Sequence, residues 1–106
     1  MNIAPNRYKN KTEEEKKQYW LNHTIDTRYR GSLSRAKKLN RLPIWSNKDE
    51  IKKIYAAAVM LSEEHNIKYE VDHIIPLNGE NVSGLHVPEN LQILTQIKNS
   101  EKSNRF

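Results

Sequence analysis

The sequence predicts a single α+β domain, mainly helical in its N-terminal part, whose C-terminal part reads strand, loop, strand, helix. Two patterns predict this order. Apolar residues recur at helical spacing as far as Asn66, and beyond it they alternate with polar residues. The length of 106 residues supports one compact core and not two. We therefore expect one domain with three parts: a basic helical segment over 1–45, a core helix within 46–66 and a C-terminal unit over 67–106.

A capping-box pattern over Thr12–Glu15 marks the start of the first predicted helix. This helix should end near Asn22, with Tyr19 and Trp20 as its apolar contacts. After a looser stretch, apolar residues at a spacing of three predict a short helix over residues 32–40.

The strongest helix signal covers residues 48–65. Asn47 and Glu50 form a second capping-box pattern at its start. One apolar stripe then repeats at helical spacing, through Ile51, Ile54, Tyr55, Ala58 and Leu61. We expect this stripe to belong to the core.

The C-terminal part changes to a period of two, which predicts a strand over residues 69–75. Residues 77–90 contain the turn formers Gly, Pro and Asn and are expected to form a loop. A second short strand follows over 91–94. Thr95 can then cap a final helix that extends to about Asn104.

The composition excludes several classes of protein. Cysteine is absent, so disulfides, thiolate-bound zinc, iron–sulfur clusters and a cysteine nucleophile are impossible. The longest apolar run, Ile54–Leu61, is far shorter than the roughly 20 residues that cross a bilayer. No apolar stretch follows the N-terminus, so no secretory signal is expected. We expect a cytoplasmic protein without a membrane span.

Basic residues concentrate in the first part of the chain. The formal net charge is +5, and residues 1–45 carry eleven bases against four acids. Six of these bases lie within fourteen positions that contain no acid: Arg28, Arg30, Arg35, Lys37, Lys38 and Arg41. Such a cluster neutralises phosphates and predicts a nucleic-acid partner, whereas the alternative is a solvated helix face.

Three polar elements stand out in the C-terminal part. Asp72 and His73 lie at the end of the first predicted strand, Asn90 precedes the second, and Asn99 lies on the final helix. Each could be structural when taken alone. Their order, spacing and strand-strand-helix context are specific in combination.

Residues 69–77 (YEVDHIIPL), 88–95 (PENLQILT) and 99–104 (NSEKSN) closely resemble the signature of the HNH endonucleases. The stretch from Arg35 to the end is similar to small stand-alone members often encoded by bacteriophages. The resemblance implies a ββα-metal (HNH) unit over 67–106. The chain departs from the family pattern at Asn99, where many members have a third histidine, and in lacking the cysteine pairs of the zinc-binding members.

Oxygen donors and an imidazole supply the chemistry that phosphodiester hydrolysis needs. Asp72 offers a carboxylate and Asn99 an amide oxygen, which favour one Mg²⁺ or Mn²⁺ ion over Zn²⁺. His73 is assigned as the general base, because an imidazole is half protonated near neutral pH. Neighbouring residues on a strand point to opposite faces, so Asp72 and His73 should act from different sides.

Three further residues complete the candidate site. The resemblance implies that Asn90 holds the loop that orients His73. Lys102, three positions after Asn99, could contact a phosphate or face solvent. His86 could touch the scissile phosphate, supply a metal ligand or pack beside Leu85.

We therefore expect a metal-dependent endonuclease that cuts double-stranded DNA and, by resemblance, leaves 5′-phosphate ends. A monomer would nick one strand, whereas a two-fold homodimer could cut both. We expect it to act inside a phage-infected bacterial host. The alternative is a catalytically weak DNA-binding or packaging accessory module of a phage machine.

Overall fold

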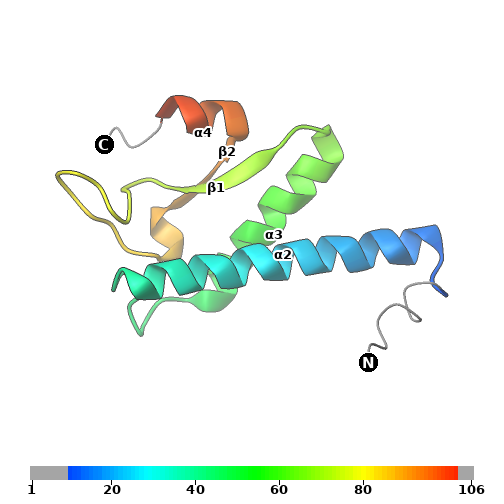
Figure 1. Ribbon diagram of the computed structural model, residues 1–106, viewed down its shortest axis with the longest axis horizontal. Coiled ribbons are helices and arrows are strands. Elements are labelled where there is room, and N and C mark those ends of the chain that lie inside the picture. Colours follow the sequence, from blue (N-terminus) through cyan, green and yellow to red (C-terminus); the bar gives the residue numbers. More distant parts are fainter. Residues whose placement is uncertain (1–9, 103–106) are drawn as a thin grey trace.

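The computed structural model describes residues 10–102 and confirms the α+β class. Within that range three helices accompany one two-stranded antiparallel sheet. None of these helices combines the length and apolar character needed to cross a membrane. In chain order the elements are α2 (Glu13–Lys38), α3 (Lys48–His65), β1 (Tyr69–His73), a 3₁₀ turn (Pro88–Asn90), β2 (Leu91–Thr95) and α4 (Gln96–Lys102) (Figure 1).

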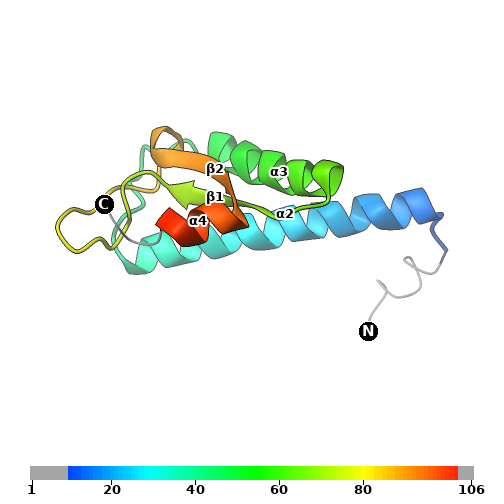
Figure 2. The ribbon, with the colours of Figure 1, turned by 90° about the horizontal axis from the view of Figure 1, so that it is seen from above.

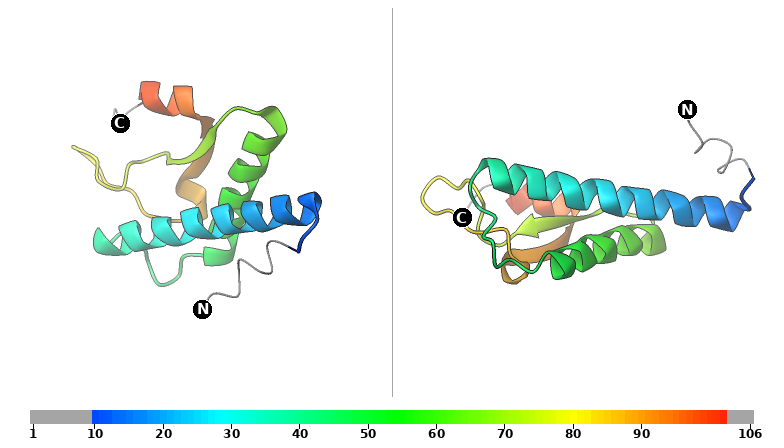
Figure 3. Two further views of the ribbon diagram at one scale, coloured as in Figure 1. Left: turned by 45° about the vertical axis from the view of Figure 1, so that its right-hand side comes forward. Right: turned by 90° about the horizontal axis from the view of Figure 1, so that it is seen from below.

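The small sheet lies between α4 on one face and the two long helices on the other (Figures 1 and 2). The long helices α2 and α3 pack against each other beneath it (Figure 3). The first turns of α2 extend beyond the rest of the molecule (Figure 2). The part of α2 that meets the sheet is therefore its C-terminal half, where the basic residues are concentrated.

One continuous helix, α2, replaces the two shorter helices that the sequence predicts. A single glycine, Gly31, costs only about 1 kcal/mol inside a helix, and the stretch before it contains no proline. Burial of Leu21 and Ala36 along one side stabilises the intervening turns. The predicted core positions are also wrong, because Tyr19 is 43% and Trp20 61% exposed, whereas Leu21 is buried.

The two helix starts predicted from capping-box patterns, at Thr12 and Asn47, are confirmed. Thr12 accepts a hydrogen bond from the backbone of Glu15, and the Glu15 carboxylate accepts one from the backbone of Thr12. Asn47 caps α3 by accepting from the backbone of Glu50. The Glu50 carboxylate pairs with Lys53 at 3.2 Å, so only half of the second capping box forms.

The two strands pair antiparallel, with Tyr69 opposite Thr95 and His73 opposite Leu91. β1 ends at His73, two residues earlier than predicted, because the next backbone groups bond to Asn90 instead of extending the ladder. Thr95 closes β2 and accepts from the backbone of Lys98, as a cap does. The predicted end of the last helix, near residue 104, lies outside the described residues.

A small apolar cluster joins the helices to the sheet. Ile51 and Tyr55 of α3 pack with Leu91 of β2, and all three are buried. Three partly buried residues surround them: Tyr29, Ile54 and Val71. The predicted α3 stripe is thus part of the core, and it positions the sheet over α2.

The loop between the strands closes tightly around Gly84. Its backbone N–H donates to the Pro76 carbonyl at 2.8 Å. A Cβ added to Gly84 would lie 2.5 Å from the carbonyl oxygen of Ile75 and 2.6 Å from the side-chain nitrogen of Asn90. No side chain fits there without moving the backbone.

Gly84→Ala should therefore lower the free energy of unfolding by about 1–3 kcal/mol, because the added methyl group overlaps fixed backbone. Gly31→Ala is the matched control. Its Cβ would meet only the flexible end of Arg35 at 3.4 Å, so better helix propensity should stabilise the protein by about 0.5–1 kcal/mol. Urea denaturation of both variants measures the difference. Equal stability of the two would contradict the close approach at Gly84.

Candidate active site

The side chains of β1 alternate between the two faces of the sheet. Glu70 and Asp72 contact residues of α4. Val71 packs into the core on the opposite face, and His73 lies on that face with it. The predicted separation of Asp72 from His73 therefore holds in the structure.

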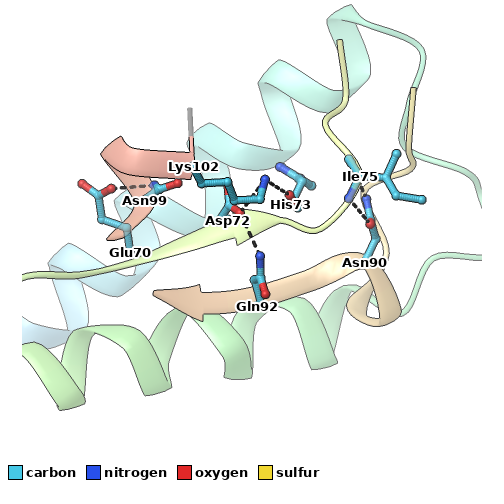
Figure 4. Close-up of polar contacts among 8 residues, drawn as sticks. All are labelled: Glu70, Asp72, His73, Ile75, Asn90, Gln92, Asn99 and Lys102. Atoms are coloured by element: carbon cyan, nitrogen blue, oxygen red, sulfur yellow. Dashed lines mark hydrogen bonds and ion pairs between the residues drawn. The ribbon is translucent and has the colours of Figure 1, made fainter. Parts of the chain in front are cut away.

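Asp72 is the anchor of the face that α4 covers. Its Oδ2 atom pairs with the Lys102 ammonium at 3.1 Å and accepts from the Gln92 side chain at 3.0 Å (Figure 4). The same ammonium donates to the backbone carbonyl of His73 at 3.2 Å. Because only 23% of the Lys102 side chain is exposed, the solvent-facing alternative for this residue is wrong.

Asn99 lies on the same side of β1 (Figure 4). Its amide nitrogen donates to Glu70 Oε1 at 2.7 Å, which fixes the rotation of the amide group. The amide oxygen is then on the opposite side of the group from Glu70. By chemistry alone, the carboxylate of Asp72 and the amide oxygen of Asn99 are donors that Mg²⁺ and Mn²⁺ accept, and Oδ2 of Asp72 is already paired with the Lys102 ammonium. Among residues 10–102, no group of three His, Asp or Glu side chains gathers as a metal cluster.

His73 contacts a second histidine on the other face. Its Nε2 atom lies 2.9 Å from Nδ1 of His86, and Nε2 of His86 lies 3.0 Å from the hydroxyl of Ser32 on α2. Burial lowers the pKa of His73 below its usual 6.5, against the opposing effect of Asp72 and with smaller help from nearby cations. The imidazole is therefore mainly neutral at pH 7.

His86 itself is completely buried, with 0% of its surface exposed. Burial, reinforced by His73 and by Arg35, lowers the pKa of His86 from 6.5 to about 4. The side chain cannot reach a phosphate in solvent, and both ring nitrogens already face protein groups. The sequence left three roles open for His86: contact with a phosphate, metal ligation and packing. The structure favours packing, together with hydrogen bonds inside the protein.

Asn90 connects the end of β1 to the loop that carries His86. Its side chain accepts from the backbone N–H of Ile75 at 2.8 Å and donates to the carbonyls of Ile75 and Leu85, each at 2.9 Å (Figure 4). Its own carbonyl accepts from Ile74 at 2.8 Å. These four bonds hold the backbone on either side of the histidine pair.

The six predicted basic residues do not form one stripe. Residues of a helix are rotated by about 100° each, so Arg28 and Arg35 share one side of α2 while Arg30 and Lys37 share another, about 200° away. Lys38 is exposed at the last turn. Arg41 lies beyond α2, where it is partly buried and donates to the Leu77 carbonyl at 3.1 Å.

Arg28 and Arg35 border a pocket of about 440 Å³ between the two long helices and β1. The pocket is also lined by Lys68, Tyr69 and Glu70. Lys68 and Glu70 pair with each other at 3.7 Å, so the two arginines give the pocket its positive charge. Of the six predicted bases, Arg28 and Arg35 are the two that line this pocket beside the strand carrying His73.

Several residues of the site are not apparent from the sequence. Ser32 bonds to His86 across 54 residues of chain, and no local pattern indicates such a contact. Gln92 and Glu70 hold Asp72 and Asn99 respectively. The alternation of β1 could have indicated Glu70, because it places this residue on the same face as Asp72.

The buried histidine should make stability depend on pH. Because the pKa of His86 is about 4 in the folded protein, the unfolded chain binds more protons below pH 6.5. Stability should be complete above pH 6.5 and decrease as the pH falls towards 4, by at most about 3 kcal/mol. Thermal unfolding between pH 4 and 7 measures this slope.

His86→Gln should flatten the slope, whereas His65→Gln, at an exposed position on α3, should keep it. An unchanged slope in His86→Gln would assign the acid sensitivity to other groups.

No family model, curated protein or solved structure matches this sequence and its fold. The function must therefore be inferred from the side chains and their placement.

Proposed function

We propose that this protein is a metal-dependent HNH endonuclease that hydrolyses phosphodiester bonds of double-stranded DNA. The proposal rests on the placement of different chemical groups on the two faces of the sheet near the end of β1. Two hard oxygen donors, Asp72 and Asn99, lie on the α4 face, and a neutral imidazole, His73, ends the strand on the other face. β1, β2 and α4 would form the ββα-metal unit.

Asp72 and Asn99 would hold one Mg²⁺ or Mn²⁺ ion. Such an ion, when bound, stabilises negative charge on the phosphoryl oxygens and on the leaving 3′ oxygen. Lys102 adds a fixed positive charge beside Asp72. It could approach a phosphate from the same side.

His73 would accept a proton from the attacking water. The water oxygen would bond to phosphorus while the bond to the 3′ oxygen breaks and that oxygen takes a proton from solvent, which leaves a 3′ hydroxyl and a 5′-phosphate end. Because burial lowers its pKa, His73 is ready as a base at neutral pH. The protonated ring can afterwards release its proton to solvent.

Affinity for DNA would come from the basic residues of α2. The pocket bordered by Arg28 and Arg35 lies beside β1, so a backbone phosphate there would pass close to the catalytic strand. Arg30 already pairs with Asp26 at 3.0 Å and faces away from this side. Arg41 holds the Leu77 loop and contributes mainly to structure. Arg28 and Arg35 would therefore make the main contacts with the DNA backbone.

His73→Ala should slow cleavage of supercoiled plasmid by about 10²- to 10⁴-fold in Mg²⁺ or Mn²⁺, because the general base is lost. His23→Ala, at an exposed position on α2, is the matched control and should cut at the parental rate. Gel analysis of nicked and linear products, with EDTA as a blank, measures both. If the wild type only retards DNA and never cuts it in either metal, the accessory-module alternative is correct.

Removing two charges from either side of α2 tests the DNA grip. In EDTA, Arg28→Gln with Arg35→Gln should weaken binding to a DNA duplex and reduce the slope of log affinity against log salt by about 2. Arg30→Gln with Lys37→Gln removes the same charge from the other side and should change the slope less. Fluorescence anisotropy across a salt series measures both. Equal effects would mean that net charge, and not this side of α2, governs binding.

A further inference from the structure

His86 has an unusually complete set of hydrogen bonds. Its backbone N–H donates to the Arg41 carbonyl at 2.8 Å, and its carbonyl accepts from the Ser46 hydroxyl at 2.8 Å. Its two ring nitrogens face His73 at 2.9 Å and Ser32 at 3.0 Å. Three segments of the chain, α2, the connection between α2 and α3, and β1, therefore hold this one buried residue in place.

The Ser32 hydroxyl decides which nitrogen of His86 carries the proton. Its oxygen lies 2.6 Å from the Tyr29 carbonyl, which can only accept. The single hydroxyl proton must therefore point at that carbonyl, and Ser32 accepts from its other two partners, His86 and the Tyr55 hydroxyl. Consequently Nε2 of His86 is protonated, and its Nδ1 atom, in a neutral ring, carries a lone pair.

The tautomer of His86 in turn determines that of His73. Because Nδ1 of His86 accepts, Nε2 of His73 must donate to it across the 2.9 Å contact. We infer that Ser32 and His86 are positioning residues that fix the tautomer of His73, with the proton on Nε2 and the lone pair on Nδ1. We call this series of hydrogen bonds, from Ser32 through His86 to His73, the relay. The lowered pKa of His86 is consistent with the neutral ring that the relay requires.

This inference deepens the proposed function and depends on it for its catalytic meaning. Nδ1 of His73 is the atom that would take the proton from water, while Nε2 keeps its bond to His86. If the relay reversed, Nδ1 of His73 would already carry a proton and could not act as a base. Ser32, on a helix outside the catalytic strand pair, would thus control whether the base is competent.

Long-range ¹H–¹⁵N NMR of the histidine rings tests the relay directly in the full chain, without metal, at pH 7.5. The wild type should show the proton on Nε2 of both His73 and His86. Ser32→Ala removes the acceptor, so a measurable share of His73 should move to the form protonated at Nδ1. Ser62→Ala is the matched control, because it removes a partly buried hydroxyl that bonds to the Ala58 carbonyl and to the Tyr69 backbone N–H and lies outside the relay.

A wild-type His73 protonated on Nδ1 would overturn the inference, and so would an unchanged tautomer in a folded Ser32→Ala protein. The wild-type spectrum alone decides the first point, so the test survives if a variant does not fold. In the plasmid assay Ser32→Ala should lower kcat about tenfold, as expected for one lost hydrogen bond, and leave KM unchanged. Failure of all plasmid cleavage would reject the nuclease proposal and leave the NMR result standing.

Discussion

The hydrogen bonds of Asn90 are the constraint on which the site depends. Its amide group satisfies the backbone on both sides of Ile75 and at Leu85, so the exit of β1 and the far end of the loop are held together. His73 lies two residues before Ile75, and His86 directly follows Leu85. An unpaired buried amide costs about 1–3 kcal/mol, so a partial set of bonds would be unstable. The histidine pair is therefore a consequence of the loop closure.

β1 places the Asp72 carboxylate and the His73 imidazole on opposite faces of the sheet, where their electrostatic environments differ. Asp72 requires positive charge beside it, and Lys102 supplies it on the α4 face. To act as the proposed base, His73 must stay neutral, and burial on the other face favours this by lowering its pKa. If both side chains shared one face, the carboxylate would stabilise the protonated imidazole more strongly and the base would be weaker. A period of two along β1 is enough to separate them.

Local patterns predicted those parts of the fold that local interactions decide. The bounds of α3 follow from its cap at Asn47 and its stripe, and the start of β1 follows from the change to a period of two. The continuity of α2 did not follow, because packing along Leu21 and Ala36 outweighs the cost of one glycine. Asp72, His73, Asn90 and Asn99 could be selected because the segments around them resemble a known family signature. The contact of Ser32 could not, since it exists only once α2 crosses beneath the sheet.

The basic helix is part of the site and not an appended arm. Ser32 lies on α2 between Arg28 and Arg35, so the element that would hold the DNA backbone also fixes the ring next to His73. A helix transmits position more accurately than a loop, since its backbone is already hydrogen-bonded throughout. Movement of α2 away from the sheet would therefore release both the pocket and the relay at once. In a chain of 106 residues, the proposed DNA binding and proton transfer would be joined through a single helix.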